Sequence, residues 1–230
     1  MVSKMRRFFS EKLPKPNRIV ALQEDVSHHF LRVVGIAPNE EVELFDGKGK
    51  ACIASLFSVE EGLAFMKWEQ DLLNKNDRPI VWVGLSLTKK DAFSNALRML
   101  TEIGVSHIVP IQVAHSVVKG AKPDRWQKIV LSAVGQSKQS QCPKLHPLQT
   151  WKSALDLLNV IPRKWILHTS PNEEPLSKAI EETAVLLGPE GGFTEKEVSL
   201  AIEKGWTIAS LSSNILKADT AAIVAGSRLF

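Results

Sequence analysis

The hydrophobic pattern of the chain changes once, and this change limits the architectures that the chain can adopt. Residues 18–70 carry short segments rich in β-branched and aromatic residues, whereas residues 80–230 alternate apolar runs with amphipathic segments. The first pattern is typical of strands in a small sheet, and the second is typical of buried parallel strands joined by helices. Between them, residues 72–79 are polar and end in proline, which indicates a domain boundary. We therefore predict an α/β chain of two domains, residues 1–72 and residues 73–230.

The first domain is expected to form a small β-barrel with one short helix. Asp46-Gly47-Lys48-Gly49 supplies residues that tolerate positive φ between two strands, as a tight hairpin requires. Asp25 is placed to accept hydrogen bonds from the unpaired amides of the first turn of the helix. The predicted strands are residues 18–22, 41–45, 51–58 and 63–68, and the predicted helix is residues 25–34.

The second domain is expected to be a parallel sheet covered by helices. Gly104 and Gly205 follow two of the helical segments and are typical helix stops. The predicted strands are residues 80–87, 108–113, 165–168, 184–187 and 207–211. The predicted helices are residues 90–103, 124–139, 150–159, 194–204 and 219–229.

Composition excludes several classes of protein. With 44% hydrophobic and 23% charged residues in 230, the chain is neither disordered nor a disulfide-stapled miniprotein. Cys52 and Cys142 are the two cysteines and have no metal-like spacing, so we expect no zinc site and a reducing, cytoplasmic environment. Residues 1–17 lack the apolar core of a signal peptide, and no run of about 18 apolar residues predicts a membrane span.

Two loops of the second domain are candidates for a binding site. Residues 187–194 read Leu-Gly-Pro-Glu-Gly-Gly-Phe-Thr and follow a predicted strand, where open α/β sheets bind ligands. Their glycines either bring the backbone close to a ligand or serve a tight turn, and both interpretations stay open. Thr194 and Glu197 have the spacing of a capping box. Neither a dinucleotide fingerprint nor a phosphate loop is present.

The second loop, residues 211–222, also leaves a strand and enters a helix. Asp219 is suited either to capping that helix or to catalysis, and Lys217 either to solvent or to a phosphate contact. His168 is the last residue of another predicted strand, beside the same site, which favours ligand contact as much as a structural role.

Taken together, these segments resemble the SPOUT methyltransferases, specifically the bacterial 16S ribosomal RNA uridine-N3 methyltransferase family. The resemblance rests on the glycine turn, on Ile215-Leu216-Lys217-Ala218-Asp219-Thr220-Ala221, and on Thr101-Glu102-Ile103-Gly104-Val105. Arg6-Arg7-Phe8-Phe9 and Phe45-Asp46-Gly47 are similar to the N-terminal PUA-like RNA-binding barrel of that family. The resemblance implies a trefoil knot in the C-terminal domain, S-adenosyl-L-methionine as cofactor, a homodimer, and action on the small ribosomal subunit.

The family's cofactor contacts carry over to loop positions of this chain. They are Leu167, His168, Leu187, Gly188, Pro189, Glu190, Gly191, Leu211, Ser212, Asn214, Ile215, Leu216 and Ala221. The chain departs from the family at Gln139, Ser212, Asn214, Lys217 and Asp219, where the family commonly has Arg, Gly, Arg, Arg and Glu. Because arginine grips phosphate bidentately, these departures concern substrate binding more than cofactor binding.

The distribution of charge favours an RNA partner. The chain carries a net charge of +4, and basic residues concentrate in residues 1–18 and 115–144. From these clusters and the barrel we expect RNA contacts by Arg6, Arg7, Arg32, Lys119 and Lys138. Phe8, Phe9 and Trp126 lie within the clusters and either stack on bases or, more often for such aromatics, belong to the core.

The implied reaction is methyl transfer to uridine N3 of 16S ribosomal RNA, with Lys217 and Asp219 as candidate catalytic residues. The proton acceptor is Asp219, a phosphate or water, and either Lys217 or a basic residue of the N-terminal arm would stabilise the negative charge that develops on the uracil. Two alternatives stay open: a non-catalytic RNA-binding assembly factor on the same fold, and a SPOUT transfer RNA 2′-O-methyltransferase.

Overall fold

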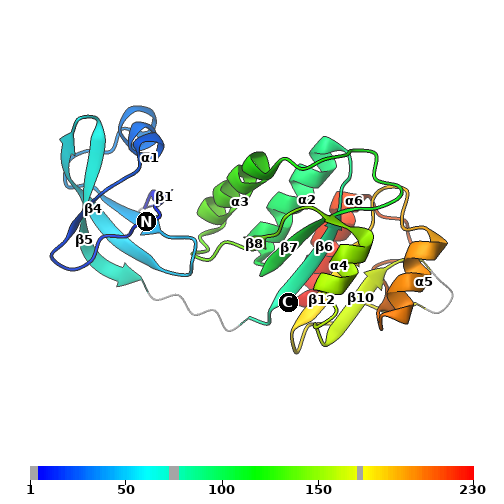
Figure 1. Cartoon of the computed structure of the whole chain (residues 1–230). Coiled ribbons are helices and arrows are strands. Elements are labelled where there is room, and N and C mark those ends of the chain that lie inside the picture. The colour runs from blue at the N-terminus through cyan, green and yellow to red at the C-terminus, as the bar shows by residue number, and fades with distance from the viewer. Residues whose placement is uncertain (1–4, 73–77, 170–172) are drawn as a thin grey trace. The chain divides into compact units, whose positions relative to one another are not determined.

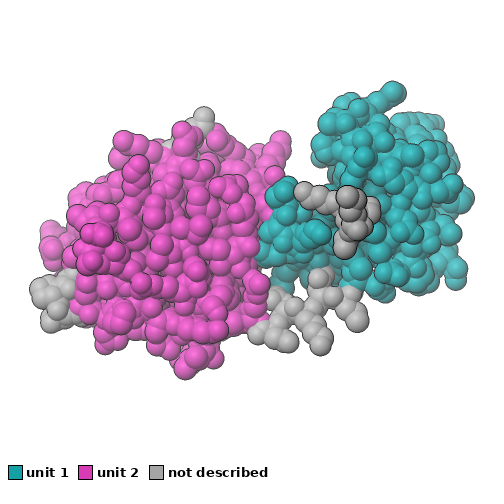
Figure 2. Space-filling model, turned by 180° about the vertical axis from the view of Figure 1, so that it is seen from behind, with its two compact units in different colours: residues 1–76, 134–142 teal, residues 77–133, 143–230 magenta. Residues whose placement is uncertain are grey.

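The computed structural model describes residues 5–72, 78–169 and 173–230 and divides the chain into two units (Figures 1 and 2). The first unit contains Met1–Asn76 and Val134–Cys142, and the second contains Asp77–Ala133 and Pro143–Phe230. Most of the expected boundary, residues 73–77, lies outside the described residues. Among the helices that the structure describes, none has the length and apolar character needed to cross a membrane.

The first unit is built on a five-stranded sheet whose strand order is β1-β3-β4-β5-β2. The β1–β3 pair is parallel, and the other pairs are antiparallel. Its strands are β1 (Arg7–Phe9), β2 (Ile19–Ala21), β3 (Glu41–Phe45), β4 (Ala51–Glu60) and β5 (Leu63–Leu72). The expected strands are present and β1 is additional, because three residues are too few to show an alternating pattern. Closure of this sheet into a PUA-like barrel stays a prediction.

The expected single helix of the first unit is α1 (Glu24–His28) followed by a π-helical turn, η1 (His29–Val34). Gly35 ends it with a φ of 68°. Asp25 accepts a hydrogen bond from a first-turn amide as expected, that of Val26 at 2.9 Å, although the N-cap residue itself is Gln23. Phe30 is fully buried and packs against Phe8, with ring centroids 4.8 Å apart, so this helix closes the core of the unit.

Residues 134–142 belong by their contacts to the first unit, although the sequence placed them in the second domain. The Arg7 guanidinium donates to the carbonyl of Val134 at 3.0 Å and to Ser140 Oγ at 2.9 Å. The amide of Cys142 donates to the carbonyl of Gly47 at 2.8 Å. Since these bonds join residues more than 90 positions apart, local sequence patterns do not reveal them.

The second unit contains a parallel sheet with the order β11-β13-β10-β12-β6-β7-β8, and β9 pairs with β7. This confirms the expected α/β class. The strands are β6 (Val81–Ser86), β7 (His107–Gln112), β8 (Lys144–Leu145), β9 (Gln149–Thr150), β10 (Arg163–Leu167), β11 (Glu174–Pro175), β12 (Thr183–Leu187) and β13 (Thr207–Ser210). The helices are α2 (Lys90–Ile103), α3 (Pro123–Ser137), α4 (Trp151–Leu157), α5 (Glu195–Glu203) and α6 (Ala218–Leu229).

Helices cover the sheet on both faces (Figure 1). Leu155 of α4 and Val198 of α5 share one buried cluster with Ile166 and Leu186 of the strands. On the other side, α2 and α6 pack against each other and α6 contacts β12. Gly226 permits this close approach, because a Cβ there would lie 3.0 Å from Ile103 Cδ1. The trefoil knot stays a prediction.

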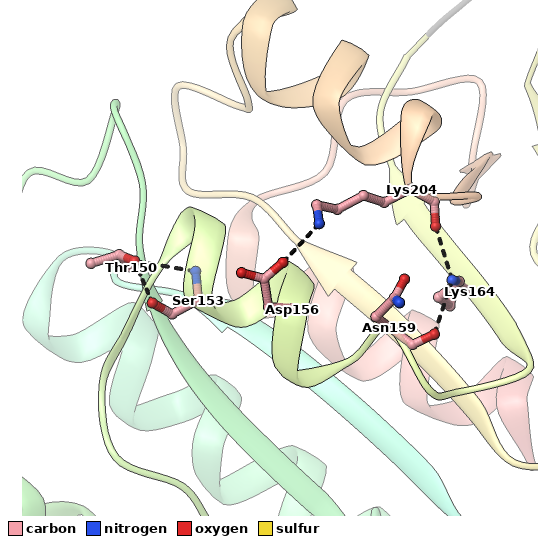
Figure 3. A network of polar contacts seen from close by, with 6 residues as sticks. All are labelled: Thr150, Ser153, Asp156, Asn159, Lys164 and Lys204. Carbon is pink, nitrogen blue, oxygen red and sulfur yellow. Dashed lines mark hydrogen bonds and ion pairs between the residues drawn. The ribbon is translucent and has the colours of Figure 1, made fainter.

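Polar contacts tie α4 to β10 and α5 (Figure 3). Thr150 caps α4 by accepting from the amide of Ser153. Lys204 Nζ lies 2.7 Å from Asp156 Oδ1, and Lys164 Nζ donates to the carbonyl of Lys204 at 2.9 Å. These contacts join α4, the start of β10 and the carboxyl end of α5.

A pair of histidines lies at the amino-terminal edge of the sheet. His107 Nδ1 and His146 Nε2 are 3.0 Å apart, and Trp82 stacks on His107 at a centroid distance of 3.5 Å. Burial, reinforced by His146 and Lys144, lowers the pKa of His107 from 6.5 to about 4. Burial also lowers the pKa of His146. The folded chain therefore holds both imidazoles neutral at neutral pH.

We expect the free energy of unfolding to fall as the pH drops from 6.5 towards 4. In that window the unfolded chain binds the protons that the folded chain excludes from His107, so acid favours unfolding. His107→Phe keeps an aromatic ring against Trp82 and should flatten this dependence in urea titrations at several pH values. His28→Phe, at an exposed position, is the control. Equal slopes for His107→Phe and the unmodified chain would contradict the assignment.

Gly47 joins the hairpin of the first unit to residues 134–142. Its φ is 69°, and a Cβ there would lie 2.9 Å from Cys142 Sγ and 3.3 Å from Phe9. Gly62 also has a positive φ, of 82°, but nothing lies within 4 Å of the position of a Cβ there. A side chain at Gly62 would therefore strain the backbone without a steric clash.

We predict that Gly47→Ala lowers the free energy of unfolding by about 2 to 4 kcal/mol, because backbone strain and overpacking add. Gly62→Ala should cost about 1 kcal/mol, the backbone part only. Chemical denaturation measures both. Equal losses in the two variants would show that the contact with Cys142 is unimportant.

Candidate functional site

Three loops meet at the carboxyl-terminal edge of the parallel sheet. They follow β10, β12 and β13, and β10 lies between the other two strands in the sheet. Because parallel strands all end at the same edge, their following loops lie side by side there. The sheet order therefore brings together segments that are separate in the sequence.

The glycine turn after β12 has structural requirements at each of its three glycines. Gly192 has a φ of 67°, and its amide donates to the carbonyl of Pro189. A Cβ at Gly188 would lie 3.4 Å from Gly192 Cα, and one at Gly191 would lie 3.1 Å from His115 Cβ. The turn interpretation thus holds, and the same absence of side chains leaves the backbone open towards the cavity described below.

Thr194 and Glu197 form the predicted capping box of α5. Thr194 Oγ1 accepts from the amide of Glu197, and Glu197 Oε2 accepts from the amide of Thr194 at 2.8 Å. Glu197 Oε1 also accepts from the amide of Ala114 at 2.9 Å, which ties the glycine turn to the loop after β7.

His115 contacts the glycine turn directly, a role that the sequence did not indicate. Its Nδ1 lies 2.9 Å from the carbonyl oxygen of Gly191 and 3.2 Å from that of Gly192. A third contact comes from the loop after β6, where the amide of Lys89 donates to Glu190 Oε1 at 3.4 Å. The turn is therefore held from two neighbouring loops.

The three loops enclose a cavity of about 340 Å³. Every residue that the resemblance assigned to the cofactor lines it: Leu167, His168, Leu187, Gly188, Pro189, Glu190, Gly191, Leu211, Ser212, Asn214, Ile215, Leu216 and Ala221. The lining also includes residues that the sequence did not indicate: Thr169, Glu173, Gly192, Phe193, Ala209, Ser210 and Ala218. These belong to the same loops and strand ends, so continuity with the predicted residues was the available signal.

The lining combines apolar side chains with backbone and a few polar groups. Among the residues that the structure describes, its carboxylates are Glu173 and Glu190, and no lysine or arginine lines it. A cavity of this kind suits a ligand with a neutral or positively charged part.

The two candidate catalytic residues lie beside the cavity and do not line it. Lys217 and Asp219 flank Ala218, which does. Lys217 is exposed and is the N-cap of α6 without a side-chain capping bond. Of the two interpretations of Asp219, that of the N-cap residue does not hold, because Lys217 is the N-cap, whereas Asp219 lies in the first turn and accepts from the amide of Thr220.

The candidate RNA-binding residues differ in their exposure and in their partners within the protein. Arg32, Lys119 and Lys138 are exposed. Arg6 is exposed but donates to the carbonyl of Val34 and lies 3.6 Å from Glu40. The prediction for Arg7 is wrong, because its side chain is 5% exposed and pairs with Glu43 at 2.8 Å.

Other candidates are also internal. Phe8 and Trp126 are buried, which confirms their interpretation as core residues. Gln139, one of the departures from the family, lies in the segment that belongs to the first unit and does not line the cavity.

The cysteines show no reactive environment. Burial raises the pKa of Cys52 to about 12 and that of Cys142 to about 11, so both thiols stay protonated. Within the described ranges, no three histidine, cysteine, aspartate or glutamate side chains gather in a way that suits a metal ion.

Comparisons with known proteins define the class of protein to which this chain belongs. A family model described as RNA methyltransferase domain matches residues 75–229, more than half of the chain. A solved structure of ribosomal RNA small subunit methyltransferase E from Neisseria gonorrhoeae, bound to S-adenosyl methionine, is 30% identical with a TM-score of 0.87. It covers 97% of this chain and 95% of its own.

Proteins related in sequence carry the same name as this solved structure. Proteins named ribosomal RNA small subunit methyltransferase E from Synechocystis and from Rickettsia conorii are 28% and 24% identical. The alignments cover 86% and 96% of this chain, and 68% and 92% of those proteins. The chain belongs to the ribosomal RNA small subunit methyltransferase E family, which confirms the family resemblance drawn from the sequence.

The contacts of His115 lead to a prediction about the rigidity of the glycine turn. We expect His115→Ala to speed hydrogen exchange at the amide of Gly192 about two- to tenfold, since a lost hydrogen bond is worth about 1 kcal/mol. His115→Asn places an amide nitrogen near the position of Nδ1 and should restore slow exchange. His168→Ala, on another cavity loop, is the control. Unchanged exchange in His115→Ala would contradict this role.

Proposed function

We propose that this chain transfers a methyl group from S-adenosyl-L-methionine to small-subunit ribosomal RNA, and that the acceptor is uridine N3 of 16S RNA. The observation that carries the proposal is the cavity at the sheet edge, lined by all the residues assigned to the cofactor. The relative from Neisseria gonorrhoeae, which shares the fold at 30% identity, is described as bound to this molecule.

The cavity fits S-adenosylmethionine in size and chemistry. Its volume of about 340 Å³ lies within the usual range of ligand sites. Backbone amides and carbonyls of the glycine turn can hydrogen-bond an adenine without charged side chains. Glu173 and Glu190 would favour the positively charged end of the ligand. When bound, S-adenosylmethionine supplies an electrophilic methyl group.

The residues of the chain would then orient the ligand and accept the displaced proton. The clamped glycine turn holds its amides in fixed positions, which reduces the entropy lost in alignment. N3 of uridine takes part in base pairing within a helix, so the target base must be unpaired or extruded.

Lys217 and Asp219 are the chain neighbours of Ala218, which lines the cavity. In our proposal Lys217 stabilises negative charge on the uracil, and Asp219, a phosphate or water takes the N3 proton. As a lysine replaces the arginine common in the family, a phosphate would meet a single point charge instead of a bidentate fork.

A homodimer is part of this proposal. The apolar end of α6 is not available to a second copy, because Leu229 is fully buried within its own unit and the Arg78 guanidinium lies over the ring of Phe230. Ile223 of α6 and Ile180 are exposed apolar residues that a second copy would cover.

The proposal predicts that the chain binds S-adenosylmethionine in this cavity. Isothermal titration calorimetry measures the affinity of the unmodified chain and of variants in the lining. Ala221→Leu adds volume to the lining and should weaken binding at least about tenfold. Thr220→Leu, at the adjacent exposed position outside the lining, should bind normally. Absence of binding by the unmodified chain, with no competition by S-adenosylhomocysteine, would favour a non-catalytic RNA-binding assembly factor.

Nucleoside mass spectrometry then identifies the product on undermodified small subunits. We expect 3-methyluridine, formed by the unmodified chain and not by Ala221→Leu. The appearance of 2′-O-methyluridine on transfer RNA would support the alternative SPOUT activity and contradict our proposal.

A further inference from the structure

A second cavity, of about 760 Å³, lies entirely within the first unit. Three segments line it: the loop between β1 and β2, the turn between β3 and β4, and the end of β5. Its lining residues are Glu11, Lys12, Leu13, Pro14, Lys15, Pro16, Arg18, Val20, Asp46, Gly49, Lys50, Ala51, Asp71 and Leu72. None of them belongs to the cavity that we assign to the methyl donor.

One wall of this cavity is apolar and conformationally restricted. Leu13, Pro14, Pro16 and Val20 come from the loop and β2, and Leu72 comes from β5. Pro14 is buried, and the proline rings limit the backbone of the loop. A rigid apolar wall of this kind suits a flat, weakly polar group such as a nucleic-acid base.

Four cations accompany the apolar wall: Lys12, Lys15, Arg18 and Lys50. All four are exposed, and none forms an ion pair with another residue that the structure describes. They therefore remain available to an anionic ligand.

The three carboxylates of the lining only partly offset this charge. Asp46 accepts from the amides of Lys48 and Lys50, at 2.8 and 3.0 Å, and so serves the hairpin turn. Asp71 accepts from Trp68 Nε1 at 3.0 Å. Glu11 is exposed at the rim.

The loop that carries three of the cations is held by its own backbone bonds. The amide of Arg18 donates to the carbonyl of Lys15 at 2.9 Å across a turn in which Asn17 has a φ of 60°. Ser10 Oγ donates to the carbonyl of Lys12 at 2.7 Å. The cations are thus presented from a fixed loop, which lowers the entropy lost on binding.

The arginines of the basic N-terminal segment are engaged within the protein, whereas its other described cations line the cavity. Arg7 is buried against Glu43, and Arg6 is engaged with Val34 and Glu40. The remaining described cations of residues 5–18 all line the cavity, where Lys50 joins them from a distant segment.

We propose that this cavity binds a nucleotide of single-stranded RNA, with its base against the apolar wall and its neighbouring phosphates on Lys12, Lys15, Arg18 and Lys50. This inference rests on the proposed RNA substrate and adds a second, non-catalytic contact to it. Cations on two separate segments suit consecutive phosphates of a strand better than a single free phosphate.

The test uses the full chain and a fluorescein-labelled ten-nucleotide oligouridylate, with binding followed by fluorescence anisotropy. The double variant Lys12→Gln/Lys15→Gln should bind at least about tenfold more weakly at 0.1 M salt, and its salt slope should fall by about 1.4, the value for two lost phosphate contacts. The control Lys67→Gln/Lys178→Gln removes the same charge from exposed positions outside the cavity and should bind normally. Equal losses in both pairs would overturn the proposal.

Two further measurements test the base contact by itself and the binding of the methyl donor by itself. An abasic ten-nucleotide strand should bind less tightly than oligouridylate, and it should not shift the methyl NMR signals of Leu13, Val20 and Leu72 as oligouridylate does. Equal affinity and equal shifts would refute the base contact. The Lys12→Gln/Lys15→Gln variant should keep full affinity for S-adenosylmethionine in calorimetry, so failure of donor binding and failure of this RNA contact are observed independently.

Discussion

The site of this protein depends on the parallel pairing of β10 with β12 on one side and β13 on the other. This pairing ends three strands at one edge and places their loops around a single cavity. Neither partner of β10 is its neighbour through a simple hairpin, so the loops converge only when the whole sheet has formed. Loss of one strand pairing would separate residues that no local interaction holds together.

The glycine turn shows how the same residues serve structure and binding. Gly192 needs a positive φ, and Gly188 and Gly191 are closely approached by Gly192 and His115. Because side chains are absent, the backbone faces the cavity, and the loops after β6 and β7 hold the turn through Glu190, Glu197 and His115. A binding surface made of backbone has few side chains to adjust, so its precision depends on these contacts.

The two units differ in how well the sequence located the residues of their candidate sites. For the cavity at the sheet edge, the family resemblance named most of the lining residues, which belong largely to loops that directly follow buried strands. For RNA contacts, charge clustering was not sufficient. Arg7 carries the charge expected of a phosphate ligand, but it is buried against Glu43 and residues 134–142. Lys50 lies outside the clusters, yet it lines the cavity with Lys12, Lys15 and Arg18.

The sequence by itself determined the α/β class, the order and extent of the main elements, with α2 and β3 correct to the residue, and the capping box at Thr194. These follow from local propensity, periodicity and short-range hydrogen bonds. Only the tertiary structure decided that residues 134–142 join the first unit, that His115 holds the glycine turn, and which cations remain free. Such features depend on contacts between residues far apart in the chain, and local sequence patterns do not show which distant residues meet.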